Sequence, residues 1–259
     1  MEPLFPSPVP TWHNDTYPAI HPINPNLSQK GKTVIITGAV SFAHAGAKHI
    51  AIMGRTFSAL EETSSQIKKT SSITTTSIFP FSVTDEAATN DLAHRVGAWD
   101  TNVKSIYIAA RAFLPTASPS ASLLSVSAAG AFFPAPVGAG LAGYMTSKIA
   151  AAKLVEYLAH EHPSLFICSV HPGVVEMKMM REAGLDVFKV PKDTVELPAH
   201  FMLWLSGAGE GEKGWLRGRV AWCNWDVGEL VEMRGKAGRE DLCTVGLVGS
   251  PFEARGKDR

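Results

Sequence analysis

A tyrosine and a lysine one helical turn apart are the residues of this chain best suited to chemistry. Tyr144 and Lys148 lie in a segment with helical periodicity, so they share one face of the predicted helix. A phenol with an ordinary pKa of about 10 exchanges protons poorly at neutral pH unless a fixed cation stabilises the phenolate. Lys148 would supply that cation, and Ser127 could hold a substrate oxygen in front of the phenol. The trio therefore predicts proton transfer to or from a carbonyl or an alcohol.

The predicted elements around the trio strengthen this interpretation. Residues 122–126 and 165–170 are apolar runs that predict two buried strands, and a helix from about Tyr144 to His160 lies between them. A tyrosine and a lysine four residues apart also occur on ordinary exposed helices, and this alternative stays open for the pair alone. A strand, a serine, this helix, a strand and a Pro-Gly turn in that order are much harder to obtain by chance.

In these features the sequence resembles the short-chain dehydrogenase/reductase family, in particular its fungal members. The resemblance implies that Tyr144 is the catalytic acid/base and that Lys148 lowers the pKa of Tyr144 and holds the nicotinamide ribose. It implies that Ser127 positions the substrate carbonyl. It also implies that Asn102 completes a proton-relay tetrad.

The same resemblance implies several cofactor contacts. Pro172, Gly173 and Val175 belong to a segment that resembles the family's turn against the nicotinamide, although Met177 stands where a threonine is common. Val83 belongs to a segment similar to the adenine side of the family's site, where the preceding serine replaces the usual aspartate. Tyr144 and Lys148 would contact the cofactor as well as the substrate.

The end of the second predicted strand indicates which cofactor is used. Arg55 follows the strand of residues 48–53, and no Asp or Glu stands there to accept hydrogen bonds from a ribose diol. Because a guanidinium pairs well with a 2′-phosphate, the sequence predicts NADP(H) rather than NAD(H). A solvated surface arginine is the alternative.

The first crossover of the predicted fold is unusually short. Residues 33–37 predict a buried parallel strand, and Gly38 follows as in a dinucleotide-binding turn. Only residues 38–47 then remain before the next strand, whereas a parallel crossover usually takes about a dozen residues or more. We therefore predict a one-turn stub without the glycine-rich turn that receives the pyrophosphate.

A second loss is predicted in the middle of the chain. Residues 85–96 predict a helix, and after Trp99-Asp100 the chain enters another helix over about 103–114 with no strand between them. Compared with the family, about thirty residues are absent, including the fourth strand, which would leave a gap between strands one and five. Mis-spliced or wrongly assigned exons explain this pattern, and so does a degenerate protein that has lost cofactor binding.

Length and composition predict a single α/β domain. The chain has 259 residues with 45% hydrophobic content, enough for one large core. The predicted fold is a doubly wound, Rossmann-like parallel sheet with helices on both faces over residues 31–259. Residues 1–30 contain seven prolines and predict an arm. Trp12, Tyr17 and Ile20 suggest that the arm packs on the domain, and a disordered tail is the alternative.

The charge and cysteine content exclude several other classes. Lys+Arg and Asp+Glu number 24 each, so neither nucleic acid nor an anionic membrane is an expected partner. The three cysteines lack disulfide or zinc spacing and, with no leader segment, predict a cytoplasmic protein. His160-Glu161-His162 suits a solvated helix end better than a metal site, so no metal is expected.

Together these features predict an NADP(H)-dependent oxidoreductase that interconverts a ketone and a secondary alcohol. The apolar segment of residues 177–188 favours a small apolar substrate, although core packing explains this segment equally well. The alternative is a family-derived binding protein or pseudoenzyme that has lost its cofactor, or a sequence truncated at the gene level from an active enzyme. By the resemblance, a homodimer or homotetramer is expected.

Overall fold

The structure is a computed structural model that describes residues 1, 3, 7–36, 40–54, 56–80, 99–176, 191–207, 212–235 and 242–246. The helix predicted over residues 85–96 and the apolar segment of residues 177–188 lie outside them. Within the described residues the fold is α/β, with parallel strands covered by helices, as predicted.

Strands and helices follow one another in an α/β order along the chain. The strands are β1 (Thr33–Ile36), β2 (His49–Gly54), β3 (Thr75–Pro80), β4 (Ser122–Val126), β5 (Phe166–His171) and β6 (Val220–Trp222). The α-helices are α1 (Ser41–His44), α2 (Phe57–Thr70), α4 (Ser105–Phe113), α5 (Ala142–Glu161), α7 (Glu196–Ser206) and α8 (Val227–Glu232). These strands form two three-stranded parallel sheets, ordered β1-β2-β3 and β4-β5-β6.

The first sheet shows the predicted short crossover. The only helix described between β1 and β2 is α1, which is a single turn of four residues. By contrast, β2 is joined to β3 through α2, a helix of 14 residues that buries Leu60 and Ile67. The stub predicted from the sequence is therefore present.

The start of α2 corrects one expectation. The pattern Ser58-Ala59-Leu60-Glu61 predicts a capping box at a helix start. In the structure the helix begins at Phe57, and Thr56 with an extended backbone (φ −106°, ψ 105°) is its N-cap residue without a side-chain cap hydrogen bond. Ser58 already lies inside the first turn, so its hydroxyl is not at the capping position, and this prediction was wrong.

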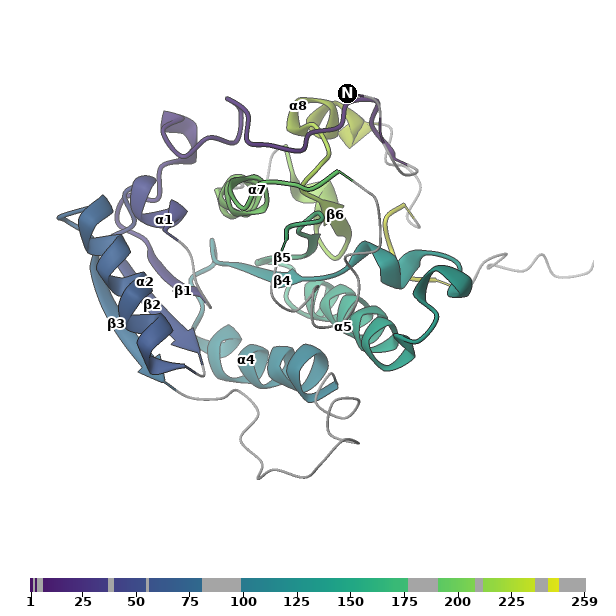
Figure 1. The fold of residues 1–259 in the computed structure, drawn as a ribbon, viewed down its shortest axis with the longest axis horizontal. Coiled ribbons are helices and arrows are strands. Elements are labelled where there is room, and N and C mark those ends of the chain that lie inside the picture. The colour runs from purple at the N-terminus through teal and green to yellow at the C-terminus, as the bar shows by residue number, and fades with distance from the viewer. Residues whose placement is uncertain are drawn as a thin grey trace, which may run out of the picture.

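The two sheets are separated where the sequence predicted a missing strand. Among the described residues β1 pairs with β2 alone and β4 pairs with β5 alone, so each has an open edge. Ile35 on β1 is 45% exposed and Val126 on β4 is 46% exposed. A π-helical turn, Asp100–Lys104, runs directly into α4, so no strand precedes that helix from Asp100 onward. Figure 1 shows the β1–β3 sheet with α2 at the left, apart from β4, β5 and β6.

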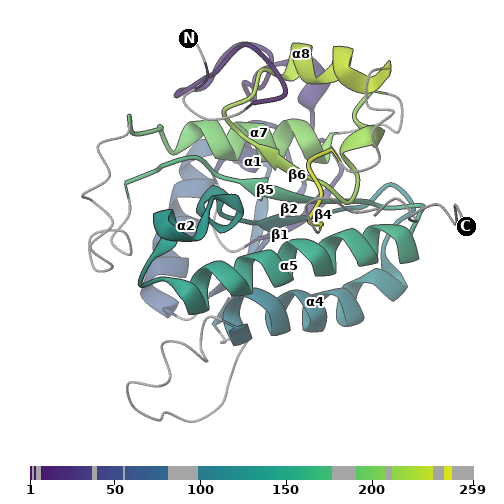
Figure 2. The ribbon, with the colours of Figure 1, turned by 90° about the vertical axis from the view of Figure 1, so that its right-hand side faces the viewer.

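A shared hydrophobic core holds the two sheets together. Ile52 of β2, Val170 of β5 and Phe201 of α7 belong to one buried cluster. A smaller cluster lies between α4, α5 and β5 and contains Ala110 and Ile167. In Figure 2, α7 and α8 lie above the second sheet while α5 and α4 lie below it, so both faces are covered.

The proline-rich arm packs on the rest of the molecule. The side chains of Trp12 and Ile20 are 3% and 0% exposed. The backbone N–H of His13 donates to the Asn224 carbonyl at 2.7 Å, and Trp12 forms an isolated bridge with Trp225. In the structure, residues of the arm between 7 and 30 therefore pack on the rest of the molecule. In the described part of the chain, the helices all fall short of the length and apolar character needed to cross a bilayer.

Candidate active site

Ser127 lies at the carboxyl end of β4. The pairing of β4 with β5 matches Val126 with Val170, and the Ser127 N–H donates to the Val170 carbonyl at 2.7 Å. The Ser127 side chain is 4% exposed, and its Oγ atom is buried with no hydrogen-bond partner among the described residues. Because buried hydroxyls normally have partners, this atom is a candidate for receiving a substrate oxygen.

The helix α5 brings Tyr144 and Lys148 to the same place. The Lys148 amine is 5.7 Å from the centre of the Tyr144 ring. The same amine donates to the Val126 carbonyl at 2.8 Å, and Val126 is the residue before Ser127. All three residues of the predicted trio therefore lie together where α5 faces the end of β4.

The contact of Lys148 with Val126 follows from the open edge of the sheet. The Ser127 N–H and the Ala121 carbonyl both bond to β5, so in a regular strand the residues between them at even positions direct their backbone groups to the other side. On that side β4 has no strand neighbour in the described part of the molecule. The Lys148 amine thus satisfies a carbonyl that would otherwise face the gap between the sheets.

Burial dominates the electrostatics of the pair. It raises the pKa of the Tyr144 phenol above its ordinary value, and it lowers the pKa of the Lys148 amine to about 8. The expectation that Lys148 lowers the pKa of Tyr144 is therefore not met in this structure. The physical reason is that both groups lose water, which disfavours the phenolate and the ammonium alike, while the amine bonds to a backbone carbonyl.

Asn102 lies beside the start of α5. It belongs to the π-helical turn Asp100–Lys104. Such turns are rare in proteins, and those that occur are often found at functional sites. The Nδ2 atom of Asn102 donates to Ser147 Oγ at 2.9 Å, and that hydroxyl donates to the Tyr144 carbonyl at 2.7 Å. Asn102 is thus tied to the backbone of Tyr144 through Ser147, and no direct hydrogen bond to Lys148 is present among the described contacts.

The predicted nicotinamide turn directly follows β5. Pro172 and Gly173 come immediately after His171, the last residue of that strand. Gly173 has a φ of +74°, and a Cβ atom there would lie 2.3 Å from Oδ2 of Asp193. Only glycine fits both the backbone conformation and the space. The turn therefore lies at the same sheet edge as Ser127.

His171 makes a contact beside the site that was not predicted from the sequence. The Ala129 N–H donates to its Nδ1 atom at 3.2 Å, which ties the loop after Ser127 to the end of β5. Burial lowers the pKa of His171 to about 3, so the imidazole is neutral and can accept this bond. The only signal for it in the sequence is a histidine directly before Pro-Gly, which does not indicate a contact with the loop after Ser127.

The fit to a dinucleotide differs between the two ends of the site. The nicotinamide and ribose end has a buried Ser127 hydroxyl without a partner and the Lys148 amine at one edge of the sheet. Gly38, Arg55 and Val83, which were predicted to contact the diphosphate and adenosine parts, lie outside the described residues. The helix that would receive the diphosphate is the single turn α1. The described residues therefore fit the nicotinamide end alone.

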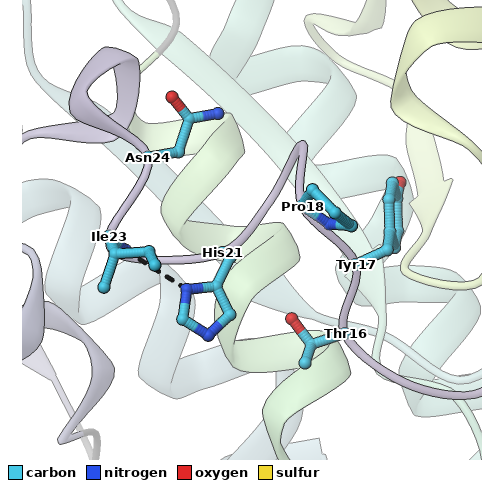
Figure 3. A pocket seen from close by; sticks show the side chains of 6 residues that line it. All are labelled: Thr16, Tyr17, Pro18, His21, Ile23 and Asn24. Carbon is cyan, nitrogen blue, oxygen red and sulfur yellow. Dashed lines mark hydrogen bonds between the residues drawn. The ribbon is translucent and has the colours of Figure 1, made fainter.

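Two surface hollows stand out in the described structure, and both lie away from Tyr144. The larger has a volume of about 460 Å³ and is formed by the arm, with Tyr17 and His21 in its wall (Figure 3). The smaller is lined by residues 119–121, 163–166, Gly214 and Arg217. Among the described residues, no group of three histidine, cysteine or acidic side chains could hold a metal ion. The site is therefore defined by its residues rather than by a hollow.

Comparisons with known proteins bear on the family and the fold of this chain. A scan against protein-family models gave no match. A short chain dehydrogenase/reductase of Claviceps purpurea is 30% identical over 94% of this chain and 95% of its own length. That alignment spans 289 positions, 30 more than the 259 residues of this chain, so at least 30 positions of the relative have no counterpart here.

Solved structures show the same fold at low sequence identity. A 3-oxoacyl-[acyl-carrier protein] reductase of Brucella melitensis with bound NAD has a TM-score of 0.63 at 15% identity, covering 80% of this chain and 94% of its own. The Pseudomonas aeruginosa RhlG/NADP complex has a TM-score of 0.62 at 16% identity, covering 78% of this chain and 98% of its own.

Proposed function

The chain belongs to the short-chain dehydrogenase/reductase family, and on this premise we propose that it is an NADP(H)-dependent oxidoreductase. It interconverts a ketone and a secondary alcohol on a small, apolar substrate. The bound nicotinamide supplies or accepts the hydride. The residues of this chain orient the substrate and move the proton.

One observation carries the proposal. The Ser127 Oγ atom is buried without a hydrogen-bond partner in the described structure, and it lies next to the carbonyl that binds the Lys148 amine. A substrate carbonyl oxygen would give this hydroxyl its partner, because a positioned hydroxyl donates well to an oxygen that gains negative charge. Ser127 then holds the oxygen, and the Tyr144 hydroxyl gives or takes the proton.

Lys148 supports Tyr144 through its charge. With a pKa of about 8, the amine is mostly protonated at neutral pH. A cation 5.7 Å from the ring centre would favour the phenolate when the phenol gives up its proton to the substrate. Asn102 acts by holding Ser147 and thereby the backbone of Tyr144.

The choice of NADP(H) rests on Arg55 in the sequence. Its guanidinium would pair with the 2′-phosphate of the cofactor. The solved structures of similar fold include one with NADP and one with NAD, so the fold is compatible with either. We expect Arg55→Ala to raise KM for NADPH by about tenfold, the equivalent of about 1.4 kcal/mol, with little change for NADH. Equal effects on both cofactors would contradict this choice.

The chain provides its own control for the catalytic role of Tyr144. Tyr157 lies on the same helix at 60% exposure, and Lys153, also four residues away, lies 5.6 Å from its ring centre. We expect Tyr144→Phe to lower kcat for NADPH-dependent reduction of small ketones by about 10²–10⁴-fold, while Tyr157→Phe leaves it unchanged. Full turnover by the Tyr144→Phe variant would refute the assignment.

A second candidate function is a binding protein on the same fold that no longer uses a dinucleotide. The single-turn α1 favours it, because a helix this short offers little of the positive end that normally receives a diphosphate. The Lys148 contact with Val126 also favours it, since the amine then has a partner within the protein. In this case the trio is a remnant that stabilises the edge of β4.

Titration of the purified chain with NADPH, followed by cofactor fluorescence, separates the two candidates. Saturable binding with a Kd in the micromolar range supports the oxidoreductase and excludes the second candidate. A lack of binding at millimolar NADPH would exclude the oxidoreductase for this polypeptide and support the second candidate.

A further inference from the structure

We propose that Asp193 is a positioning residue for the Pro172–Val175 turn and that it connects the proline-rich arm to this turn. The inference rests on the proposed function, in which this turn lies against the nicotinamide. The carboxylate lies 19 positions after Val174 in the chain and 179 positions after Asn14.

The carboxylate of Asp193 is buried and bound by neutral donors. Its residue is 7% exposed. Oδ2 accepts the Val174 N–H at 2.5 Å, while Oδ1 accepts from Nδ2 of Asn14 at 2.6 Å and from Nδ2 of Asn224 at 3.0 Å. None of the ion pairs within the described residues involves Asp193. Three amide donors therefore hold a buried negative charge.

A buried carboxylate without a cation is costly, so its partners must be held in fixed positions. Here they come from three distant parts of the chain: the arm, the turn and the segment after β6. The Asp193 N–H also donates to the Val174 carbonyl at 3.0 Å, so Asp193 fixes both backbone groups of Val174. Asp193 therefore fixes the position of the turn relative to the end of β5.

The fit at Gly173 shows how closely the carboxylate approaches the turn. A Cβ atom at that position would lie 2.3 Å from Oδ2 of Asp193 and 3.2 Å from Sγ of Cys223. The turn can approach Asp193 only because position 173 has no side chain. The contact between the turn and Asp193 therefore requires glycine at position 173.

The arm contributes to the same network. Asn224 is fully buried, and its Nδ2 atom donates both to Asp193 and to the His13 carbonyl at 2.8 Å. The Thr194 N–H donates to the Asn14 carbonyl at 3.0 Å. Residues 13 and 14 of the arm are thus built into the support of the turn.

The test compares Asp193→Asn with Asp226→Asn. Asp226 accepts from Nε2 of His13 at 2.9 Å and caps α8. Asp226→Asn therefore removes the same charge as Asp193→Asn and weakens a contact of the arm, but it does so away from the turn. Asparagine remains a good N-cap. In Asp193→Asn the new NH₂ group must face donors, either the Val174 N–H or the amides of Asn14 and Asn224, so the network that holds the turn loses hydrogen bonds in either orientation.

Two measurements are made on the full chain. Hydrogen exchange of the Val174 amide reports the turn directly, without any cofactor. NADPH titration reports the function, and we expect Asp193→Asn to raise Kd for NADPH about tenfold, the equivalent of about 1.4 kcal/mol. Asn14→Ala removes one of the donors to Oδ1 and should raise Kd about threefold, with the fold intact.

Faster exchange at Val174 in Asp193→Asn, with unchanged exchange in Asp226→Asn, supports the positioning role. Unchanged protection of Val174 in Asp193→Asn overturns it, and so does an NADPH affinity equal to that of the unaltered chain. If the unaltered chain does not bind NADPH, the proposed function fails, while the exchange at Val174 still decides whether Asp193 positions the turn. If Asp193→Asn does not fold, the same criteria apply to Asn14→Ala.

Discussion

The two three-stranded sheets have the same parallel geometry but differ in how deeply their residues are buried. In β5, five of the six residues are buried, and all three residues of β6 are buried. In β1, no residue is buried and two of the four are exposed. Parallel strands are normally covered on both faces, so β5 and β6 follow the rule and β1 does not.

This difference in burial separates the two parts of the predicted site. Ser127 follows β4, the open-edge strand of the second sheet, and Tyr144 and Lys148 lie on α5, which packs on that sheet. The segments that would bind the diphosphate follow β1 and β2, the sheet with the short crossover. Under the proposed function, the proton-transfer residues therefore lie on the well-buried sheet, whereas the segments predicted to hold the phosphate end adjoin the sheet in which α1 is a single turn.

The largest effect is expected from replacing Lys148 with methionine, which should lower the activity without lowering the stability. We expect kcat to fall by about 100-fold or more, because the cation that favours the phenolate is lost. The free energy of unfolding near pH 7 should rise or stay constant, because a buried amine with a pKa lowered to about 8 is costly to keep charged.

The measurement is the steady-state rate together with denaturant unfolding, and Lys153→Met is the control. Lys153 lies on the same helix and donates to Glu156 Oε1 at 2.7 Å and to the Val245 carbonyl at 2.9 Å. Its replacement should leave kcat unchanged. A loss of more than about 2 kcal/mol of stability in Lys148→Met would show that the bond to Val126 outweighs the desolvation cost.

Truncation of matched isoleucines tests the difference between the sheets. Ile167 on β5 is 0% exposed, whereas Ile35 on β1 is 45% exposed. Ile167→Ala should cost about 2–5 kcal/mol of unfolding free energy, and Ile35→Ala should cost less than about 1 kcal/mol. Denaturant unfolding followed by circular dichroism measures both, and equal losses would contradict the proposed difference in burial.

Much of this arrangement was predictable from the sequence because its signals are local. The run Ser122–Val126 is apolar and short, and it is a strand with the predicted bounds. The helix α5 has regular spacing over Ala142–Glu161 and was predicted to within about two residues at its start. The lack of a strand between Asp100 and α4 was predictable because the helical pattern begins directly after Asp100.

The features that the sequence did not predict depend on contacts between distant residues. Asp193, Asn14 and Asn224 meet across up to 210 positions of chain, and no periodic pattern marks them. The raised pKa of Tyr144 comes from burial, which depends on how the elements pack. The prediction of a capping box was wrong for a different reason. The helix begins at Phe57, after the extended residue Thr56, which is earlier than the pattern indicated.

Acidic pH should lower the stability of the folded protein through protonation of His171. Burial lowers its pKa from 6.5 to about 3, so the unfolded chain binds a proton at a higher pH than the folded chain does. The unfolding free energy should therefore fall as pH decreases from about 6.5 to about 3, with a slope of at most ~1.4 kcal/mol per pH unit from this group. Above pH 6.5 this contribution is constant.

Denaturant unfolding between pH 4.5 and 7.5 measures this slope. In His171→Gln the side-chain carbonyl can still accept the Ala129 N–H, and the titrating group is gone, so the slope should decrease by up to that amount. His200, whose pKa burial lowers to about 4, contributes to the remaining slope. An unchanged slope in His171→Gln would show that His171 is not the group that titrates.

The smallest effect is expected at the open edge of β1. Since Ile35 is nearly half exposed and β1 has no second strand neighbour among the described residues, Ile35→Lys should change the unfolding free energy by less than about 0.5 kcal/mol. A lysine on an edge strand also opposes pairing with another chain, so light scattering should show slower aggregation. Val170→Lys on the buried sheet is the contrasting variant and should not fold. A loss of more than about 2 kcal/mol in Ile35→Lys would mean that this edge is covered in solution, because a charge is costly only where water is excluded.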